Sequence, residues 1–396
     1  MKKIGVVTAT RAEYGVLKNV IRYIQQDDCL ELLLFVTGTH LVREYGYTVN
    51  DIVNDGFQIT EKINVLMKSD TPSSISKNMG MAAILFGDAF ERNPIDLLIV
   101  LGDRYELLPV CQAAMCHCIP IAHISGGETT EGLIDEAVRH CVTKMSYLHF
   151  PGCEDYRKRI IQLGESPDRV FNFGDVGVEN ILKLDYLSKE ELENSLGMNL
   201  SKDYFCVTFH PVTLEKGTAE KQVGDLLKVI KSMPDYHFII TKSNADTGNG
   251  VINKKIDEFV SNSNNSFAYE SLGILRYLSL MKYSKGVIGN SSSGIIESPI
   301  LRIPTINIGD RQKGRLKAKS IIDCQPEPES IKEAIELALD DEFVKTNCDG
   351  SSPYGGGNTA KLIVNTIKNF LVNDKINLKK KFFDVDFTID ESNKEG

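Results

Sequence analysis

Short apolar runs alternate with amphipathic stretches along most of the chain. Apolar runs of roughly four to eight residues are typical of buried β-strands, and apolar residues that recur every three or four positions are typical of helices with one buried face. The first half of the chain predicts strands at residues 3–8, 32–37, 97–101, 119–124, 147–150 and 170–173. The second half predicts strands at residues 204–209, 237–241, 266–269, 286–288 and 305–308. The amphipathic stretches predict helices at residues 16–26, 75–92, 133–144, 225–232 and 331–339.

This alternation of strands and helices predicts an α/β fold, with parallel sheets covered by helices on both faces. The run LLIVL at 97–101 fits a strand that is buried on both sides. Residues 182–203 separate the two series of strands; they are rich in Lys, Glu, Asn and Ser and predict a short helix at 188–195. We therefore expect two α/β domains of similar size with a cleft between the carboxyl ends of their strands, and a link between the domains near residues 175–178.

The overall composition limits the partners and the location of the protein. Its 396 residues are enough for two domains, and its net charge of −9 argues against a nucleic-acid or anionic-membrane partner. The nine cysteines follow no repeated spacing, which favours reduced thiols. The first apolar run is too short for a signal peptide, and no segment approaches the roughly 20 apolar residues of a membrane span. These features predict a cytoplasmic protein with no nucleic-acid and no membrane partner.

Ligands of such sheets bind just beyond the carboxyl ends of the strands, so the residues there are the first candidates for a site. Arg11 follows the first strand in TATRAEYG, where a helix N-terminus and a guanidinium would together suit a phosphate; an ordinary surface arginine is the alternative. No G-x-G-x-x-G is present there, so the usual dinucleotide fingerprint is absent. Asp103 and Arg104 follow the strand at 97–101, where one could act as a base and the other could hold a phosphate. Asp103 could instead cap a helix.

The stretch HISGGETTEGLIDEAVRH at 123–140 gathers carboxylates behind a pair of glycines. Glu128, Glu131 and Asp135 could be acid and base, metal ligands or part of a solvated helix face. Asp135 and Arg139 stand four residues apart, so an ordinary helical ion pair is an alternative for that aspartate. The stretch has neither H-E-x-x-H nor a C-x-x-C pair, and we predict no metal.

The second half of the chain predicts a site for a diphosphate. VIGNSSSGIIESP leads from a strand through Ser291 and Ser292 into a helix that carries Glu297, and hydroxyls with free N–H groups at a helix start suit phosphates. Glu297 could accept hydrogen bonds from both hydroxyls of a ribose, and a capping box is the alternative. The polar residues that follow other strands are His210 in FHPVT, Asn244 in TKSNADTGN and Arg311 in NIGDRQKGR. A lone histidine is more often structural, and a stretch rich in Asn, Asp and Gly is often a turn.

Nine motifs between residues 8 and 315 resemble, in order, those of the hydrolysing UDP-N-acetylglucosamine 2-epimerases and of their relatives that act on UDP-N,N'-diacetylbacillosamine. The motifs are TATRAEYG, the GTH that ends at His40, GDRYELL, H-I-x-G-G-E, IDEAVRHCVTKMSYLH, FHPVT, SNADTG, GNSSSGIIE and INIGDRQKGR. Nine matches in one order are far more specific than any one alone. Members of this family supply sugars for the synthesis of nonulosonic acids such as sialic or legionaminic acid.

The resemblance implies a GT-B type of fold with two Rossmann-like domains. Residues 1–175 would form the first domain with the acid and base residues, residues 176–365 would form the UDP-binding domain, and a C-terminal helix and tail at 366–396 would cross back to the first domain. It also implies no metal, no nicotinamide cofactor, and a homodimer or homotetramer. The implied reaction begins with loss of the proton on carbon 2 and departure of UDP from carbon 1, which gives a glycal. Water then adds at carbon 1 and a proton returns to carbon 2 on the opposite face.

The resemblance also implies roles for the candidate residues. The acid and base set would be Asp103, Glu128, Glu131 and Asp135. The departing diphosphate would be stabilised by Arg11, Arg104, His210, Ser291, Ser292 and Arg311. Further contacts with the substrate are implied for His40, Asn244 and Glu297.

The chain departs from many members of this family at Ser125. They carry an acid there, in H-I-E-G-G-E, whereas this chain has H-I-S-G-G-E. The stretch from Glu128 to Asp135 is also one residue longer than in those members. We expect the longer loop to bring Glu131 or Glu128 into the vacated position, and Asp135 is the firmer candidate for an acid or base.

Three other functions stay open from the sequence. A non-hydrolysing 2-epimerase would return UDP to the sugar, but those enzymes resemble H-V-E-A-G followed by P-E-E in place of the G-G-E loop. A GT-B glycosyltransferase would share the diphosphate site and would not need the acid cluster. A UDP-sugar sensor without activity is the third, and the presence of Asp103 and Asp135 argues against it. The sequence does not distinguish between the two candidate sugars.

Overall fold

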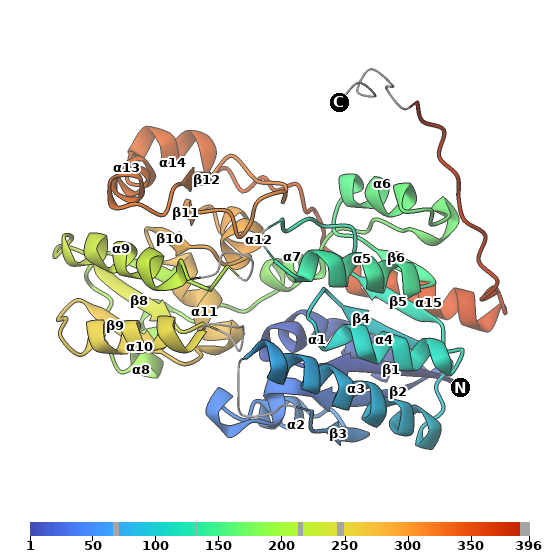
Figure 1. The fold of residues 1–396 in the computed structure, drawn as a ribbon. Helices are drawn as coiled ribbons and strands as arrows, with labels where there is room; N and C mark the ends of the chain where they lie inside the picture. Colours follow the sequence, from blue (N-terminus) through green and yellow to red (C-terminus); the bar gives the residue numbers. More distant parts are fainter. Residues whose placement is uncertain (66–70, 132, 213–216, 244–248, 389–396) are drawn as a thin grey trace.

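The protein consists of two α/β lobes that lie side by side (Figure 1). The structure is a computed structural model of the chain, and it describes residues 1–65, 71–131, 133–212, 217–243 and 249–388. Over these residues each lobe is built on one sheet of six parallel strands with helices on both faces. The α/β fold with two Rossmann-like units is therefore confirmed. Within the same residues no helix is both long and apolar enough to cross a membrane.

The first lobe has the strand order β3-β2-β1-β4-β5-β6. Its strands are β1 (Lys2–Thr8), β2 (Leu30–Thr37), β3 (Glu61–Ile63), β4 (Leu97–Leu101), β5 (Ile121–Ile124) and β6 (Leu148–Phe150). The chain begins in the middle of the sheet, moves to one edge, and then continues from β4 to the other edge. The order therefore reverses between β1 and β4, and a ligand of such a sheet binds beyond the strand ends at this point.

The second lobe repeats this arrangement with the order β12-β11-β10-β7-β8-β9. Its strands are β7 (Tyr204–Thr208), β8 (His237–Thr241), β9 (Ser266–Tyr269), β10 (Gly286–Gly289), β11 (Thr305–Ile308) and β12 (Ile321–Cys324). Here the order reverses between β7 and β10, which gives a second place for a ligand.

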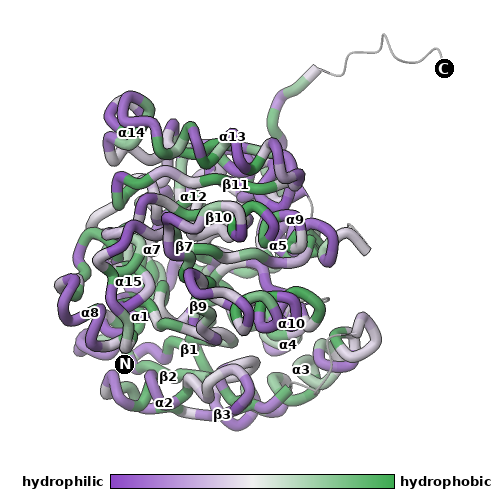
Figure 2. Tube along the Cα trace, turned by 90° about the vertical axis from the view of Figure 1, so that its left-hand side faces the viewer, coloured by the Kyte–Doolittle hydropathy of each residue, from purple (hydrophilic) through white to green (hydrophobic). Residues whose placement is uncertain are grey.

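The helices bury apolar side chains against both faces of the sheets. Successive residues of a strand point to opposite faces. Leu34 accordingly packs on the face covered by α1, and Phe35 packs against Phe86 of α3 on the other face. Figure 2 shows hydrophobic residues along the central strands and alternating polar and hydrophobic residues along the outer helices. The helices of the first lobe are α1 (Arg11–Gln25), α2 (Val49–Asn54), α3 (Pro72–Arg92), α4 (Leu107–Cys116), α5 (Asp135–Met145) and α6 (Glu154–Gln162). The remaining helices are α7 (Val176–Leu182), α8 (Lys189–Leu196), α9 (Ala219–Lys231), α10 (Asn249–Val260), α11 (Gly273–Lys282), α12 (Ser293–Ile300), α13 (Pro328–Ala338), α14 (Asp341–Asn347) and α15 (Thr359–Val372).

Polar side chains fix the starts of several helices. At α1 the hydroxyl of Thr10 accepts from the N–H of Glu13, and the Glu13 carboxylate accepts from the N–H of Thr10, which is a capping box. Ser188 and Glu191 form the same arrangement at α8. The short helix expected at 188–195 is therefore confirmed, and its cap explains why it forms in a stretch without a core strand.

The prediction of a strand at residues 170–173 is wrong. Only Val170 forms an isolated bridge, with His149. Beyond it the chain leaves the sheet, and the rings of Phe171 and Phe173 stack on each other and on Phe150. The apolar residues there thus fill a core without pairing as a strand.

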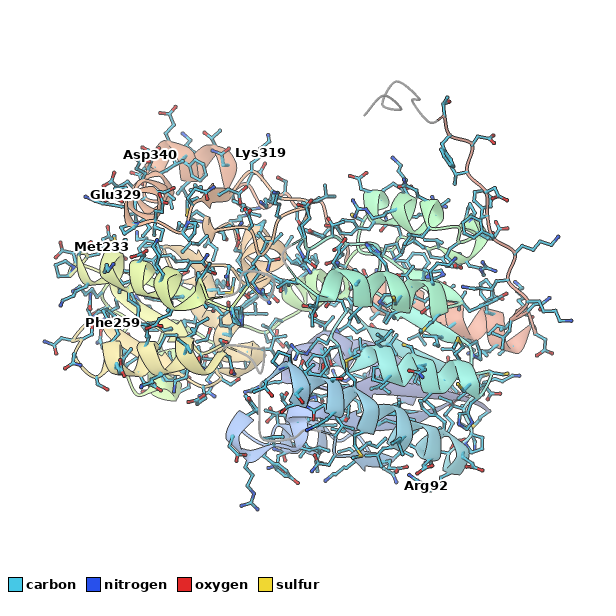
Figure 3. The ribbon with its side chains drawn as sticks, viewed as in Figure 1. Arg92, Met233, Phe259, Lys319, Glu329 and Asp340 are labelled. Atoms are coloured by element: carbon cyan, nitrogen blue, oxygen red, sulfur yellow. The ribbon has the colours of Figure 1, made fainter. Side chains whose placement is uncertain are left out.

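Two edge strands were not predicted. β3 and β12 are short and only partly buried, so their side chains give no continuous apolar run. In β3, Glu61 lies 2.5 Å from Nη2 of Arg92, the last residue of α3, which Figure 3 places at the edge of the first lobe away from the second. Charged residues of this kind are typical of an edge strand.

The chain crosses between the lobes twice. The first crossing leads through Asp175 into α7, and the second leads back into α15. α15 packs against α1 and adds Ile363 to the core of the first lobe. The two crossings lie side by side, because the N–H of Asp175 donates to the carbonyls of Tyr354 (3.0 Å) and Gly355 (3.1 Å).

A buried carboxylate anchors the C-terminal segment, which runs along the outer edge of the first lobe past α6 (Figure 1). Nζ of Lys380 donates to both carboxylate oxygens of Glu165, at 2.9 and 3.0 Å. Lys144 (2.6 Å) and Arg169 (3.2 Å) contact the same carboxylate. Burial acts to raise the pKa of Glu165, but hydrogen bonds from His149 and Lys144 outweigh it, with others, and lower the pKa to about 2.

Glu165→Gln is expected to lower the free energy of unfolding by about 3 kcal/mol at neutral pH, because it removes the buried carboxylate that pairs with Lys144, Arg169 and Lys380. A carboxylate with a lowered pKa stabilises the fold above its unfolded pKa of 4.5, and this stabilisation is lost as the pH falls toward 2. The difference between the wild type and the variant should therefore shrink below about pH 4, as measured by urea unfolding. Glu154→Gln removes an exposed ion pair with Arg157 and serves as the control, with an expected change below about 0.5 kcal/mol. Equal losses in the two variants would contradict this role of Glu165.

Candidate active site

Asp103 lies at the switch point of the first sheet, immediately after β4. Gly102 before it has a φ of +81°, a left-handed conformation that turns the chain out of the strand. Oδ2 of Asp103 accepts a hydrogen bond from Nη2 of Arg139, whose side chain is completely buried on α5. Burial acts to raise the pKa of Asp103, but the charges of Arg139 and Arg315 outweigh it and hold the pKa below its usual range. Asp103 is therefore an ionised carboxylate, as a base must be.

Arg139 also fixes the loop between β5 and α5. It donates to the backbone carbonyl of Glu128 (3.0 Å), to Oγ1 of Thr130 (2.9 Å) and to Oε2 of Glu136 (3.0 Å). A buried guanidinium is stable only when its donors are paired in this way. Arg139 was not among the predicted site residues, because the spacing along a helix indicates partners on the same helix only. The structure shows that it joins this loop to Asp103.

Glu128 is the buried carboxylate of this loop, with 3% of its surface exposed. Its Oε2 lies 2.7 Å from Nη2 of Arg315, which is on the loop after β11 of the second lobe. Burial acts to lower the pKa of Arg315, and the charge of Glu128 outweighs this effect and raises it. The ion pair therefore joins the two lobes. Arg315 was not predicted either, because nothing in its motif indicates a partner so distant in sequence.

Glu131 and Asp135 are the other acids of the predicted set. Glu131 is exposed, and its Oε2 lies 3.7 Å from Nζ of Lys313. Asp135 is the first residue of α5 and is half-buried. Ser125, where an acid was expected, is half-buried and has a φ of +61°. Of the two glutamates expected to replace that acid, the structure buries Glu128 and exposes Glu131.

Arg11 is the first residue of α1 and reaches across to the second lobe. Its Nη1 donates to Oγ of Ser271 (2.8 Å), and its Nε lies 3.4 Å from Oδ2 of Asp51. Gly273 has a φ of +74°, and a Cβ on it would lie 2.1 Å from Nη2 of Arg11. Glycine at this position thus leaves room for the guanidinium. Arg11 places a positive charge between the lobes, as a phosphate site requires.

A second group of charges lies at the strand ends of the first lobe. Arg104 is half-buried, and its Nε lies 3.3 Å from Oε2 of Glu106. Glu13, which was not predicted, accepts from the N–H groups of Ala9 (2.8 Å) and Thr10 (3.2 Å). Burial raises the pKa of Glu13 to about 7, although the positive charge of Arg104 acts to lower it. The Thr-x-x-Glu spacing could have indicated this residue, but that spacing alone indicates a helix cap.

His40 is completely buried in the first lobe. Its Nε2 lies 3.1 Å from Oγ1 of Thr8, and its Nδ1 lies 2.8 Å from Oγ1 of Thr48. Burial lowers the pKa of His40 to about 4, so the ring is neutral. Contact between His40 and a sugar stays a prediction, and it would require one of these two hydrogen bonds to be exchanged.

The second lobe places its predicted residues at the switch point between β7 and β10. Ser291 and Ser292 follow β10 and lead into α12, which begins at Ser293. The side chain of Asn290 joins the two strand ends. Its Oδ1 accepts from the N–H of His210 (2.7 Å), and its Nδ2 donates to the carbonyl of His210 (2.8 Å). This pair of hydrogen bonds sets His210 beside the serine-bearing turn.

The loop after β11 contacts the same turn. Nη1 of Arg311 (3.1 Å) and Nε2 of Gln312 (2.9 Å) donate to the carbonyl of Asn290. Glu297 lies in α12, where its Oε2 accepts a hydrogen bond from Oγ of Ser293. Burial raises the pKa of Glu297, and the bond from Ser293 opposes this.

The two lobes thus contribute different chemistry. Carboxylates and arginines come from the first lobe, and hydroxyls, a helix start, a histidine and further arginines come from the second. Of the predicted residues, Asn244 lies outside the described residues. Among the described residues, no group of three or more His, Cys, Asp and Glu side chains is arranged to hold a metal ion.

One protein family, described as UDP-N-acetylglucosamine 2-epimerase, has a profile that matches residues 22–368. The match extends over both lobes. The chain belongs to the UDP-N-acetylglucosamine 2-epimerase family. The resemblance drawn from the nine motifs is therefore confirmed.

The sequences of several members of this family are similar to this chain over nearly its full length. "Polysialic acid biosynthesis protein P7" of Escherichia coli is 42% identical over 389 residues, which cover 97% of this chain and 98% of that protein. A GDP/UDP-N,N'-diacetylbacillosamine 2-epimerase (hydrolyzing) of Campylobacter jejuni is 42% identical over 386 residues, 97% of this chain and 99% of the relative. A UDP-N,N'-diacetylbacillosamine 2-epimerase (hydrolyzing) of Legionella pneumophila is 30% identical, over 95% of this chain and 98% of the relative.

Solved structures of the epimerase family have the same fold. The crystal structure of UDP-GlcNAc 2-epimerase from Neisseria meningitidis bound to UDP-GlcNAc has a TM-score of 0.81 at 22% identity, and covers 93% of this chain and 100% of that one. The S. aureus MnaA–UDP structure has a TM-score of 0.79 at 19% identity, and covers 97% of this chain and 100% of that one. The GT-B type of arrangement expected for the two lobes is confirmed.

Proposed function

We propose that this protein is a hydrolysing 2-epimerase. It converts a UDP-2-acetamido sugar, either UDP-N-acetylglucosamine or UDP-N,N'-diacetylbacillosamine, to UDP and the free 2-epimer for nonulosonic acid synthesis. The observation that carries the proposal is that one loop of the second lobe contacts both candidate groups. This loop, which follows β11, pairs with the buried Glu128 and also donates a hydrogen bond to the turn before Ser291. The names of the Campylobacter and Legionella relatives support hydrolysis, and the name of the Escherichia coli relative supports the pathway.

In the first step the bond between carbon 2 and its hydrogen breaks, and a carboxylate takes the proton. The electron pair left on carbon 2 forms a double bond to carbon 1, and UDP departs with the electrons of the bond from carbon 1 to oxygen. We assign the base to Asp103, because its pKa is held low and the carboxylate is ionised. Departure of the diphosphate must drive this step, because the proton on carbon 2 is only weakly acidic.

In the second step the oxygen of water bonds to carbon 1 and one of its protons passes to a carboxylate. The electron pair of the double bond takes a proton from a carboxylic acid at carbon 2, on the opposite face. The two proton transfers occur on opposite faces, so a second carboxyl group is needed. Glu128 is our first assignment because it is buried in the loop that Arg139 fixes to Asp103, and Asp135 at the start of α5 is the next. Glu131 is a weaker assignment because its side chain is exposed.

The departing diphosphate gains negative charge, which guanidinium groups, hydroxyls and a helix N-terminus stabilise. The group we assign to this task consists of Arg11, Arg104, His210, Ser291, Ser292 and Arg311. We assign Glu297 to the ribose hydroxyls, and Asn244 and His40 keep their predicted contacts with the nucleotide and the sugar. No metal or nicotinamide enters the proposed reaction.

We further propose that the protein acts in the cytoplasm as a homodimer or homotetramer. Exposed apolar side chains on α3 (Met81 and Ile84) and α4 (Met115) support a dimer contact through these helices. The proposed domain limits are 1–175, 176–365 and 366–396, and the short crossing at Asp175 supports the first of them.

Incubation of the protein with each UDP-sugar in deuterium oxide tests the function. The proposal predicts free UDP and a free sugar with deuterium on carbon 2, detected by mass spectrometry and NMR, because the returned proton comes from solvent-exchanged groups. GDP-linked analogues belong in the same series, since the name of the Campylobacter relative includes GDP.

Each rival function gives a different outcome of this experiment. A nucleotide sugar labelled on carbon 2 would indicate the non-hydrolysing epimerase. UDP release without the label would indicate a GT-B glycosyltransferase or a simple hydrolase. Absence of any reaction would favour a UDP-sugar sensor.

A further inference from the structure

Two loops from different lobes contact each other between the lobes. One is the acid loop, residues 127–131 between β5 and α5, and the other is the clasp loop, residues 309–316 after β11. Oγ1 of Thr129 donates to the carbonyl of Gly314 (2.5 Å), and the N–H of Glu131 donates to the carbonyl of Lys313 (3.3 Å). Figure 1 shows the acid loop reaching from α5 toward the elements around α12.

The ion pair between Glu128 and Arg315 is the buried part of this junction. The side chains are 4% and 10% exposed, and their atoms lie 2.7 Å apart. The loops approach closely because position 314 is a glycine: a Cβ there would lie 2.5 Å from Oγ1 of Thr129. Gly314 also has a φ of +88°, which favours glycine. Both the space and the backbone conformation therefore require glycine at the contact.

Each loop is tied to a different half of the proposed site. The clasp loop binds the turn before Ser291, through the bonds from Arg311 and Gln312 to the carbonyl of Asn290. The acid loop is tied to Asp103 through Arg139. A contiguous set of contacts thus runs from the assigned diphosphate site to the assigned acid and base.

We propose that Arg315 is a positioning residue, which holds the Glu128 carboxylate in its working geometry only while the clasp loop is docked on the acid loop. A nucleotide that binds at Ser291 and Arg311 then steadies the clasp loop, and through Arg315 it steadies Glu128. Through this coupling, a bound diphosphate would favour the geometry of Glu128 that proton transfer requires. This inference rests on the proposed function for the identity of the nucleotide and the reaction.

The test compares three variants of the clasp with one control. Arg315→Gln removes the charge, Arg315→Lys keeps it with a shorter reach, and Gly314→Ala separates the loops without changing any charge. Lys317→Gln is the matched control, since Lys317 pairs with Asp323 within the second lobe (2.8 Å). For each protein, kcat, KM, the dissociation constant of UDP and the thermal midpoint are measured.

The expected result is a loss in kcat with little change in UDP binding. Arg315→Gln and Gly314→Ala should lower kcat by about 30-fold or more, because a displacement of about 1 Å in a reacting group can cost about 100-fold. Arg315→Lys should have a kcat at least about fivefold higher than that of Arg315→Gln, since a cation still faces Glu128. The UDP dissociation constant should stay within about threefold, and Lys317→Gln should match the wild type. Unchanged kcat in Gly314→Ala and Arg315→Gln would overturn the proposal.

The double variant Glu128→Gln/Arg315→Gln separates positioning from a general structural role. If Arg315 acts through Glu128, the double variant should lose no more kcat than Glu128→Gln alone, since the second change removes a function that is already lost. Multiplied losses would overturn the proposal. If Arg315→Gln does not fold, because one charge of a buried pair is left alone, then the double variant and Gly314→Ala decide the question.

Hydrogen exchange of residues 128–131 distinguishes failure of this inference from failure of the proposed function. UDP should slow exchange of these amides in the wild type and in Lys317→Gln, and it should do so much less in Gly314→Ala. This measurement needs UDP binding and no turnover. Equal protection in the wild type and Gly314→Ala would overturn the coupling even in an active enzyme, whereas a wild type that releases no UDP from either sugar would overturn the function alone.

Discussion

Asp103→Asn is expected to lower kcat by about 10³-fold and to leave the affinity for UDP unchanged. Asparagine has nearly the same shape but cannot take up the proton from carbon 2, and general acid–base groups typically contribute about 10²–10⁴-fold. The low pKa of Asp103, set by Arg139 and Arg315 against the effect of burial, keeps the carboxylate ionised in the wild type. UDP binding should persist because, apart from Arg104, the assigned diphosphate residues follow strands other than β4.

The measurement is steady-state release of UDP together with UDP binding by calorimetry. Asp88→Asn, an exposed position on α3, is the matched control and should retain full activity. A thermal midpoint is needed for Asp103→Asn, because the variant removes one of the two carboxylates that pair with the buried Arg139. A folded Asp103→Asn with turnover within about tenfold of the wild type would exclude Asp103 as the base.

The second large effect is expected for Glu128 and distinguishes it from Glu131. Glu128→Gln should lower kcat by about 10²–10⁴-fold, whereas Glu131→Gln should stay within about threefold of the wild type. The reason is burial: Glu128 is 3% exposed and lies against Arg315, while Glu131 is in solvent beside Lys313. Both changes remove one negative charge from the same loop, so each variant controls for the other.

Deuterium incorporation gives a second measure for this pair. If Glu128 returns the proton to carbon 2, Glu128→Gln should still exchange the substrate proton but should release little epimerised sugar. Full activity in Glu128→Gln with loss in Glu131→Gln would reverse the assignment and place the exposed glutamate in the position left by Ser125.

The strands that position the site could be predicted because they are buried on both faces. The run LLIVL matches β4 at both ends, and the polar residue that follows it, Asp103, lies at the switch point as expected. The edge strands β3 and β12 could not be predicted, since a short, partly exposed strand leaves no apolar run. The run at 170–173 is apolar for a different reason, because its phenylalanines stack in a core without strand pairing.

The candidate site residues divide in the same way. Ser291 and Arg311 could be located because each follows a strand that the pattern predicts. Arg139 and Arg315 could not, since their importance lies in contacts with carboxylates far away in the sequence. Three residues separate Glu128 from Glu131, and the pattern gives no sign of which one the loop turns inward.

The paired crossings between the lobes limit how the lobes can move relative to each other. The N–H of Asp175 donates to the carbonyls of Tyr354 and Gly355 in the returning segment, so the two crossing segments lie along one line between the lobes. Such a double connection restricts relative movement of the lobes: rotation about this line would keep the hydrogen bonds, whereas sliding or twisting of one lobe against the other would break them. The returning chain also ends in α15, which completes the core beside α1. A movement of the lobes that keeps these bonds would therefore separate and rejoin the acid loop and the clasp loop along a single path.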